Sequence, residues 1–523
     1  MSHQFSQVPS AKIPRSSFNR SHGYKTTFDS GYLVPIFLDE VLPGDTLNLR
    51  ANLFGRLATP LKPIMDNMFL ETFFFFVPNR LVWENWQKFN GEQENPGDST
   101  DFSIPTCATG TVQAGSIADY YGIPPGVNAA LTDISVLPFR SYDLVWNEWF
   151  RDQNLQQSAV VDVNDTGQTI AAYNLRRRGK RHDYFTSSLP WPQKGDPVTV
   201  GLSGDAPVLG IAIDDPTATA GGPAGATWRT TEGESSSLWN NHWQGEIAAE
   251  SIQGGAFPYH DIRADLTAAT GISINDLRQS FAIQRLLERD ARGGTRYIEI
   301  IRSHFGVTSP DARLQRPEFL GGGSSMVNIN PVAQTAADDI GSEQTPLANL
   351  AAFGTVSASG HGFTKSFVEH GHVIGLVNVR ADLTYQQGLN RMWSRQTRFD
   401  FFWPALSHLG EQAVLSKEIF VDSSEEDEDV WGYQEAFAEY RYKPSLITGK
   451  FRSQASDSLD VWHLSQDFAD RPVLSAEFIE DNPPIDRIIA VPDEPQFLLD
   501  CYFNYRCARP MPLYGVPGLI DHF

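Results

Sequence analysis

Residues 46–53 read TLNLRANL, and residues 68–77 read MFLETFFFFV. The first stretch alternates apolar and polar side chains, which is typical of a strand with one buried face. The second is a continuous, aromatic-rich run that ends at Pro78, as in a strand buried on both faces. Short apolar runs recur along the chain between scattered Gly and Pro residues. This pattern predicts a mainly β protein with one β-sandwich core that carries long loop insertions.

A few stretches depart from the strand pattern. Residues 81–89 and 142–150 place Trp and Phe at helical spacing, so short helices are expected to pack there. Residues 273–292 give the clearest helix, with a serine to cap the start and two glycines after the end. Residues 297–305 are expected to form a strand. Alternation returns between residues 362 and 385, as in further strands.

Composition and charge limit the class of protein. The chain has a formal net charge of −22, which argues against a simple basic nucleic-acid-binding domain. It does not argue against a chain whose basic residues gather on one side. Three cysteines (Cys107, Cys501 and Cys507) are too few for a disulfide framework and fit a reducing compartment. The first residues lack the apolar core of a signal peptide, so a soluble protein made in the cytoplasm, with no membrane association, is expected.

Two groups of basic residues could contact nucleic acid. Residues 1–28 have no acidic side chain and read as an extended basic arm, either a disordered terminus or an arm that faces nucleic acid. Residues 176–181 hold five basic side chains and are followed by Tyr184, Phe185 and Trp191. Such a cluster should face solvent or anions, as a solvated loop, a subunit contact or a phosphate site with rings for base stacking. The candidate DNA-binding residues are Lys12, Arg15, Arg20, Lys25, Arg176, Arg177, Arg178, Lys180 and Arg181.

Two acidic stretches are expected at the surface. Residues 196–256 are rich in Gly, Ala, Thr, Ser and Asp without periodicity, which is typical of an insertion in a larger domain. Residues 422–429 read DSSEEDED and cannot be core. They are interpreted as a solvated loop, with divalent-ion binding as the alternative; the glycine that a helix-loop-helix calcium site needs is missing.

The sequence carries no recognisable catalytic motif. It has no phosphate-binding loop of the Walker type, no HExxH zinc motif and no GxSxG nucleophile elbow. His370 and His372 would share one face of a strand, as metal ligands do in cupin-type jelly rolls, but the glutamate that should follow is absent. Both are therefore interpreted as ordinary strand histidines. No catalytic residue, metal or cofactor is expected.

Four long stretches together resemble one known family. They lie in the same order as in that family and span the chain from end to end, whereas residues 196–256 and about 310–360 match poorly. The stretches resemble the major capsid protein of Microviridae, in its gokushovirus branch. They are FDSGYLVPIFLDEVLPGDTLNLRANLFGRLATPLKPIMDNMFLETFFFFVPNRLVWENW (28–86), RRRGKRHDYFTSSLPWPQKG (176–195), NDLRQSFAIQRLLERDARGGTRYIEII (275–301) and RPMPLYGVPGLIDHF (509–523).

The resemblance implies a fold and an assembly. The fold would be an eight-stranded antiparallel jelly roll of the viral capsid type, and sixty copies would close a T=1 icosahedral shell around circular single-stranded DNA. The divisions would be an interior arm (1–28), the first part of the jelly roll (29–195), a surface insertion (196–256) and the remaining jelly roll with the C-terminal segment (257–523). In gokushoviruses an insertion forms protrusions at the threefold axes, and 196–256 is the candidate here. The candidate host-attachment residues in it are Asp214, Asp215, Trp228 and Arg229.

The resemblance also implies partners. These are other copies of the chain, the DNA genome, a small basic DNA-packaging protein, scaffolding and pilot proteins, and a host surface receptor. The protein would belong to the virion capsid and assemble in the host bacterial cytoplasm, with its basic residues inward and its acidic loops outward. Two other classes stay open, since fold alone does not settle function. One is a jelly-roll carbohydrate-binding or hydrolytic protein, and the other is a free single-strand DNA-binding protein.

Overall fold

The computed structural model describes residues 14–196, 198, 208–209, 263–264, 274–294, 296–306, 315–336, 338–340, 343–345 and 347–514. Contacts divide the chain into two units. One comprises residues 1–194 together with 289–523, and the other comprises residues 195–288. In the second unit, β6 (Val208–Leu209) pairs with β7 (Arg263–Ala264). Most of the insertion predicted at 196–256 lies outside the described residues.

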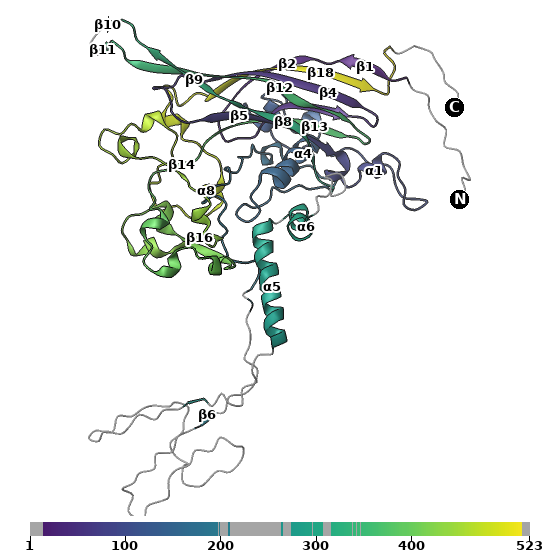
Figure 1. Ribbon diagram of the computed structural model, residues 1–523. Helices are drawn as coiled ribbons and strands as arrows, with labels where there is room; N and C mark the ends of the chain where they lie inside the picture. Colours follow the sequence, from purple (N-terminus) through teal and green to yellow (C-terminus); the bar gives the residue numbers. More distant parts are fainter. Residues whose placement is uncertain are drawn as a thin grey trace, which may run out of the picture. The chain divides into compact units, whose positions relative to one another are not determined.

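The larger unit is built around two antiparallel sheets, seen edge-on in Figure 1. In the six-stranded sheet, one edge of β18 pairs with the N-terminal strands β1 and β2, and its other edge pairs with β4. The four-stranded sheet has the order β3-β13-β5-β8. The strands of the first sheet are β1 (Ser16–Asn19), β2 (His22–Phe28), β18 (Phe497–Arg509), β4 (Thr46–Leu57), β12 (Leu350–Ser366) and β9 (Asn328–Ala333). Those of the second are β3 (Val34–Val41), β13 (Gly371–Ala381), β5 (Met68–Pro78) and β8 (Glu318–Met326).

The main hydrophobic core lies between these sheets. Every second residue of β4 and β18 is buried, including Leu49, Leu53 and Phe503, because successive side chains of a strand point to opposite faces. From the other sheet, residues such as Phe74 and Val377 join the same cluster. The predicted half-buried strand at 46–53 is confirmed, and the fold is a β sandwich of the viral jelly-roll type.

The outer face of the four-stranded sheet is covered by helices and loops. Phe75 and Ile374 pack there in a second cluster with Trp83, Phe139 and Trp146. β5 is therefore covered on both faces, as its continuous apolar sequence predicts. The covering elements include η1 (Asn79–Leu81), α1 (Trp86–Phe89), α2 (Ile117–Tyr120), α3 (Ala129–Thr132), α4 (Leu137–Val145) and η2 (Trp146–Phe150).

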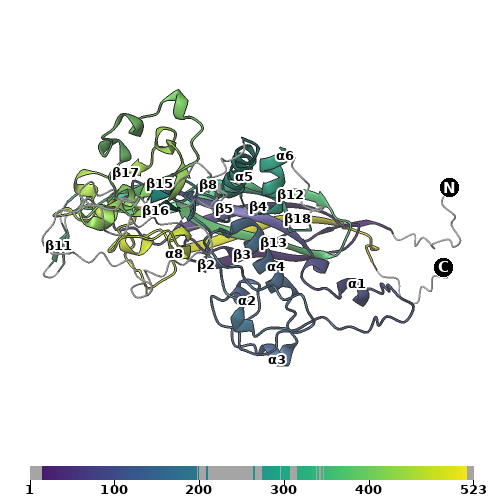
Figure 2. The same cartoon turned by 90° about the horizontal axis from the view of Figure 1, so that it is seen from below.

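A third cluster of aromatic residues supports a smaller region of loops. It packs Phe185, Trp431 and Phe478 around the two-stranded sheet of β15 and β16. Figure 2 shows this region at one end of the sandwich. Its elements are β14 (Thr384–Tyr385), β15 (Glu411–Leu415), α7 (Ser416–Ile419), β16 (Val430–Glu435), β17 (Ser445–Leu446) and α8 (Ala476–Ile479), while β10 (Asp338–Ile340) and β11 (Glu343–Thr345) form a separate hairpin.

The helix predicted at 273–292 is confirmed as α5 (Ile274–Gly293), in which Phe281 is 65% exposed. The prediction of a strand at 297–305 is wrong, because these residues form helix α6 (Tyr297–Phe305). The Glu299 carboxylate accepts a hydrogen bond from the backbone N–H of Arg296 (3.1 Å), which caps the first turn, and Gly306 ends the helix with φ 69°. No helix among the described residues is long and apolar enough to cross a membrane.

Candidate nucleic-acid interface

The predicted N-terminal arm is a strand of the sandwich from Ser16 onward. Residues 16–19 and 22–28 pair with β18, so the expectation of an extended terminal arm is wrong for this part. Lys25 forms an exposed ion pair with Asp500 (2.7 Å), and the Arg20 guanidinium binds the Asp39 carboxylate (Nη2–Oδ1 2.9 Å). Arg15 donates to the Thr46 hydroxyl (2.5 Å). Lys12 lies outside the described residues.

The second predicted group, Arg176–Arg181, runs between two other parts of the backbone. The Leu33 N–H donates to the Arg176 carbonyl, and the Arg178 N–H donates to the Gly31 carbonyl, both at 2.9 Å. On the other side, the Lys180 N–H donates to the Ile479 carbonyl (2.7 Å). These hydrogen bonds fix the segment as part of the fold and decide where its side chains point.

The first two arginines of the group have partners within the chain. Arg176 pairs with Asp143 (3.1 Å) and stacks on the ring of Trp146. Arg177 lies 4.1 Å from the ring centre of Tyr32 and donates to the amide oxygen of Asn482 (2.8 Å). Asp143 is 2% exposed, and this burial raises its pKa to about 6 even though Arg176 acts in the opposite direction.

Arg178 belongs to an ion-pair network on the outer face of the four-stranded sheet. Its guanidinium binds the Glu71 carboxylate, which also accepts from Arg380 (Nε–Oε1 3.0 Å). Burial of Glu71 acts to raise the pKa of this carboxyl, but the two arginines outweigh it and hold the pKa below its ordinary value. The network therefore neutralises the charge of Arg178 within the subunit.

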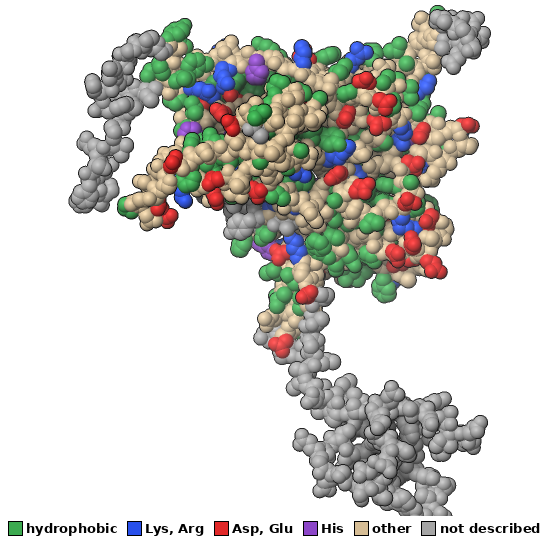
Figure 3. All heavy atoms as spheres, turned by 180° about the vertical axis from the view of Figure 1, so that it is seen from behind, with side chains coloured by type: hydrophobic (Ala, Val, Ile, Leu, Met, Phe, Trp, Pro, Cys, Tyr) green, Lys and Arg blue, Asp and Glu red, His purple; other side chains and the backbone are tan. Residues whose placement is uncertain are grey.

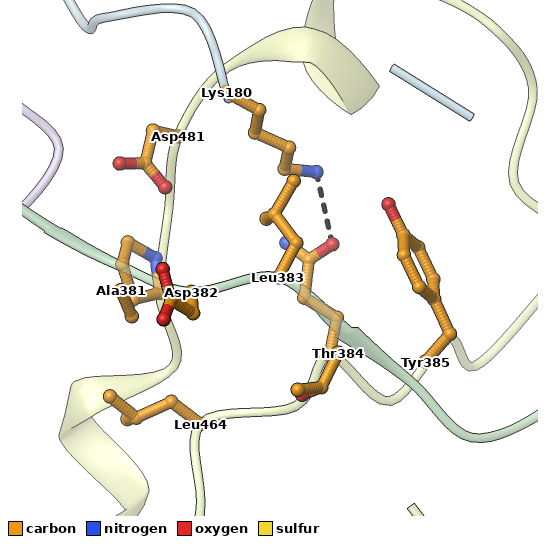
Figure 4. Close-up of a pocket in the computed structure, with 10 residues that line it drawn as sticks. Lys180, Ala381, Asp382, Leu383, Thr384, Tyr385, Leu464 and Asp481 are labelled. Atoms are coloured by element: carbon orange, nitrogen blue, oxygen red, sulfur yellow. Dashed lines mark hydrogen bonds between the residues drawn. The ribbon is translucent and has the colours of Figure 1, made fainter. Parts of the chain in front are cut away.

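Lys180 is buried, which contradicts the expectation that the whole cluster faces solvent or outside anions. Its ammonium donates to the Gln466 side-chain oxygen (2.9 Å, dashed line in Figure 4). It also donates to the Phe478 carbonyl. Burial lowers the pKa of Lys180 to about 8, and burial likewise raises the pKa of nearby Asp481 to about 6. Both ionisable groups line a cavity of only about 10 Å³, which has no room for a phosphate.

Of the five basic side chains in this group, only Arg181 is exposed. Together with Arg178, it lines a groove of about 400 Å³ that also contains Phe73, Trp149 and Phe150. The rings expected to stack with bases are placed differently. Tyr184 and Phe185 are each 4% exposed and belong to the third aromatic cluster, so they cannot meet a base.

A surface that sequence reasoning missed is the outer face of the six-stranded sheet. Figure 1 shows the labelled helices of this unit on the other side of the sandwich, so the face is uncovered. Arg50 and Arg56 of β4 and Arg506 of β18 occupy its outward positions and are exposed. None of these three arginines forms a hydrogen bond or ion pair with another described residue, which leaves their charges free for a ligand.

The register of the strands brings these arginines together with exposed aromatic rings. Arg506 lies opposite Asn48, two residues along β4 from Arg50, so the two guanidiniums are diagonal neighbours whose backbones are about 7–8 Å apart. Tyr502 and Phe54 point outward from β18 and β4 and are 53% and 54% exposed. Cations interleaved with exposed rings suit a single-stranded nucleic acid, because phosphates pair with the cations and bases stack on the rings.

The electrostatics of this sheet face differ from those of the whole chain. At the outward positions of the six strands, Asp500 is the one acidic residue among those described, and Lys25 neutralises it. The face therefore carries a net positive charge in a chain whose formal charge is −22. Lys25 lies on this face, whereas Arg178 lies on the far side of the sandwich, so the two predicted basic groups are not one site.

The acidic stretch at 422–429 folds around an arginine. Arg471 binds Asp422 (2.8 Å) and Asp427 (3.0 Å) and lies 3.6 Å from Glu426. Asp427 is only 7% exposed, so the expectation that the whole stretch is solvated is wrong there. Acidic side chains gather on the surface near β16 in Figure 3. Within the part of the chain that the structure describes, no group of three or more His, Cys, Asp or Glu residues could hold a metal ion.

The predicted histidines and cysteines lie in buried or packed positions. His372 is 4% exposed on β13, its Nδ1 has no hydrogen-bond partner, and burial lowers its pKa to about 4. The ring of His370 packs against Trp86 instead. The three cysteines are buried free thiols. The candidate attachment residues Asp214, Asp215, Trp228 and Arg229 lie outside the described residues.

Comparison with known proteins gives consistent matches along the whole chain. The family model described as "Capsid protein (F protein)" matches residues 6–519. Capsid protein VP1 of Bdellovibrio phage phiMH2K is 49% identical over 537 residues, covering 100% of this chain and 98% of that protein. Capsid protein VP1 of Chlamydia phage 1 is 45% identical (99% and 98% covered), and that of Spiroplasma virus 4 is 36% identical (99% and 97% covered).

Proposed function

The chain belongs to the phage capsid protein (F protein) family, and on that premise we propose that sixty copies build a T=1 icosahedral shell around circular single-stranded DNA. The family makes it a structural protein of the virion capsid and points to a role without catalysis. The observation that supports the proposal most is the extent of the match, since nearly the full length of both this chain and its relatives is aligned. The two-sheet sandwich agrees with it.

We infer that the DNA meets the uncovered face of the six-stranded sheet. The free guanidiniums of Arg50, Arg56 and Arg506 would pair with phosphates, and Tyr502 and Phe54 would stack with bases. Such contacts depend on salt and read little sequence. This face would then line the interior of the shell. Of the predicted interior residues, Arg15 and Lys25 lie at or beside its edge strands, which supports the same orientation, whereas Arg20 binds Asp39 of the other sheet.

The role proposed for Arg176–Arg181 is narrower than the one expected from sequence. Four of its basic side chains bind groups of the same chain, so a phosphate would have to displace them. Arg181 lines a groove on the far side of the sandwich, so any contact that it makes with DNA would be separate from the contact proposed for the six-stranded sheet. For the others, including Lys180, the contacts within the subunit support a structural role.

The charge of the subunit supports the proposal of further partners. A chain with a net charge of −22 must enclose a polyanion, so a small basic packaging protein is proposed to supply positive charge inside the shell. Scaffolding and pilot proteins and a host surface receptor complete the proposed partners, with assembly in the host bacterial cytoplasm. Host attachment is assigned to a protrusion formed by residues 196–256.

Sedimentation and negative-stain microscopy of the assembled protein, before and after nuclease, test this function. The expected result is uniform icosahedral particles with a protein mass of about 3.5 MDa, sixty times the 58.2 kDa of one chain, that protect single-stranded DNA. Small oligomers without protected nucleic acid would contradict the proposal and favour the jelly-roll carbohydrate-binding or hydrolytic alternative.

A further inference from the structure

A cluster of exposed aromatic side chains lies on the loops beside β15 and β17. The chain between β14 and β15 forms three single-turn helices, η5 (Arg391–Trp393), η6 (Arg398–Asp400) and η7 (Pro404–Leu406), which project from the molecule (Figure 2). Soluble monomers rarely leave large contiguous apolar patches open to water. The aromatic patch comprises Phe399 (73% exposed), Phe401 (48%), Phe402 (47%), Trp403 (42%) and Tyr440 (51%).

Arginine side chains hold three rings of the patch in place. The guanidinium of Arg395 lies 5.4 Å from the ring centre of Phe401 and 4.3 Å from that of Tyr440, and it pairs with Glu439 (3.0 Å). Arg398 lies 4.6 Å from the ring centre of Trp403. Since these three rings are already held, a partner that covers them loses little further conformational entropy.

A groove of about 600 Å³ adjoins the patch. Phe399, Leu409 and Phe437 supply apolar parts of its lining, and charges of both signs supply the rest, including Lys417 and Glu428. A lining of mixed sign does not suit a polyanion such as DNA, which prefers a surface of one sign. Aromatic rings and arginines are instead enriched at the centre of protein interfaces, and polar and charged side chains such as those of the groove are found at the rim.

We propose that a second copy of this chain covers the aromatic patch and its groove in the assembled shell. The inference rests on the proposed function, because a closed shell requires every subunit to bury surface against copies of itself, about 800 Å² per partner in a standard interface. The patch supplies the large, preordered rings that contribute most to binding at such contacts.

The test compares two double variants of the full-length chain by sedimentation under conditions where the wild type assembles. F399S/W403S removes two rings of the patch, and it should weaken assembly roughly tenfold or more while the thermal unfolding of the free subunit is retained. L131S/V368S is the matched control, since it removes two apolar side chains that are 81% and 87% exposed outside the patch. This control should assemble like the wild type.

A single cysteine at position 399 tests the contact directly and needs no loss of assembly. The native cysteines are buried, so F399C supplies the accessible thiol among the described residues. This thiol should react with a maleimide dye in the free subunit and be protected at least tenfold in purified assembled particles. Equal reactivity in both states would overturn the inference, as would protection of the free subunit by another protein or a lipid without any assembly.

The sedimentation outcomes are equally decisive. Normal assembly of F399S/W403S, or an equal loss in both double variants, would overturn the patch as a specific contact between copies. If F399S/W403S does not fold, the labelling of F399C decides alone. If the wild type forms particles but the prediction for the patch fails, the proposed function is retained and only the patch contact is rejected. If the wild type forms no particles, both the proposed function and the patch contact are rejected.

Discussion

Replacing Arg50, Arg56 and Arg506 together by glutamine removes three positive charges from the uncovered sheet face and leaves its shape unchanged. All three side chains are exposed and have no described partner, so the fold should lose almost no stability. Binding of single-stranded DNA should weaken, because each arginine that meets a phosphate releases a bound counterion from the DNA.

The size of the effect follows from the number of contacts. For single strands, the slope of log affinity against log salt is about 0.7 for each neutralised phosphate, so three lost contacts should flatten it by about 2. Between about 50 mM and about 200 mM salt, the wild type should then lose roughly twentyfold more affinity than the triple variant.

Fluorescence anisotropy of a labelled single-stranded oligonucleotide with unassembled subunits, over a series of salt concentrations, measures this slope. The matched control is R278Q/R285Q/R289Q, which removes the same charge from exposed positions of α5 and should change the slope little. Equal slopes for the wild type and the sheet-face variant would refute the assignment of DNA to this face. A flatter slope in the α5 variant alone would place the DNA contact on α5 instead of the sheet face.

Three further predictions concern the stability of the unassembled chain, measured by chemical denaturation. E71Q removes a carboxylate that binds two arginines and should lower the free energy of unfolding by roughly 3 kcal/mol. D500N, in the exposed ion pair with Lys25, should lower it by less than about 1 kcal/mol. Equal losses in the two variants would contradict the role of the buried network. The pKa of His372 is about 4 in the folded chain, against an ordinary value of 6.5. Between pH 6.5 and pH 4 the unfolded chain therefore binds more protons than the folded chain, so the folded chain loses stability as the pH falls. The free energy of unfolding of the wild type should drop by roughly 3 kcal/mol relative to that of H372Q across this window. A constant difference between the two proteins would show that the ring does not stay neutral. Gly31 has φ +80°, and an added Cβ would lie 2.0 Å from a backbone carbonyl, so G31A should cost roughly 2 kcal/mol or more, and more than G91A at a position with positive φ and open space.

The strands of the core could be predicted because their signal is local. In residues 46–53 the alternation of side chains is itself the property that buries one face of β4, and the apolar run at 68–77 reflects the cover on both faces of β5. Residues 297–305 were predicted wrongly because a short apolar run fits either a strand or a helix. There the capping carboxylate of Glu299 decided for the helix.

The candidate site could be predicted less well, because its charges are arranged by contacts distant in sequence. Arg177 binds Asn482, which lies 305 residues away in the sequence, and Arg178 binds Glu71, which lies 107 residues away. No local sequence pattern therefore shows that the two arginines have partners. Arg50 and Arg56 stand at ordinary polar positions of a strand. Nothing in the strand shows that its outward face stays open and gathers Arg506 from the other end of the chain.

The sequence by itself determined the kind of fold, the main strands and, through its long matching stretches, the capsid family. These properties follow from the order and spacing of side chains along short segments, because the alternation of apolar and polar residues indicates which face of a strand is buried. Only the tertiary structure decided which basic residues are neutralised within the subunit and which face outward together. Free charge on a surface depends on all the partners that the folded chain brings near it, and those partners come from residues hundreds of positions apart.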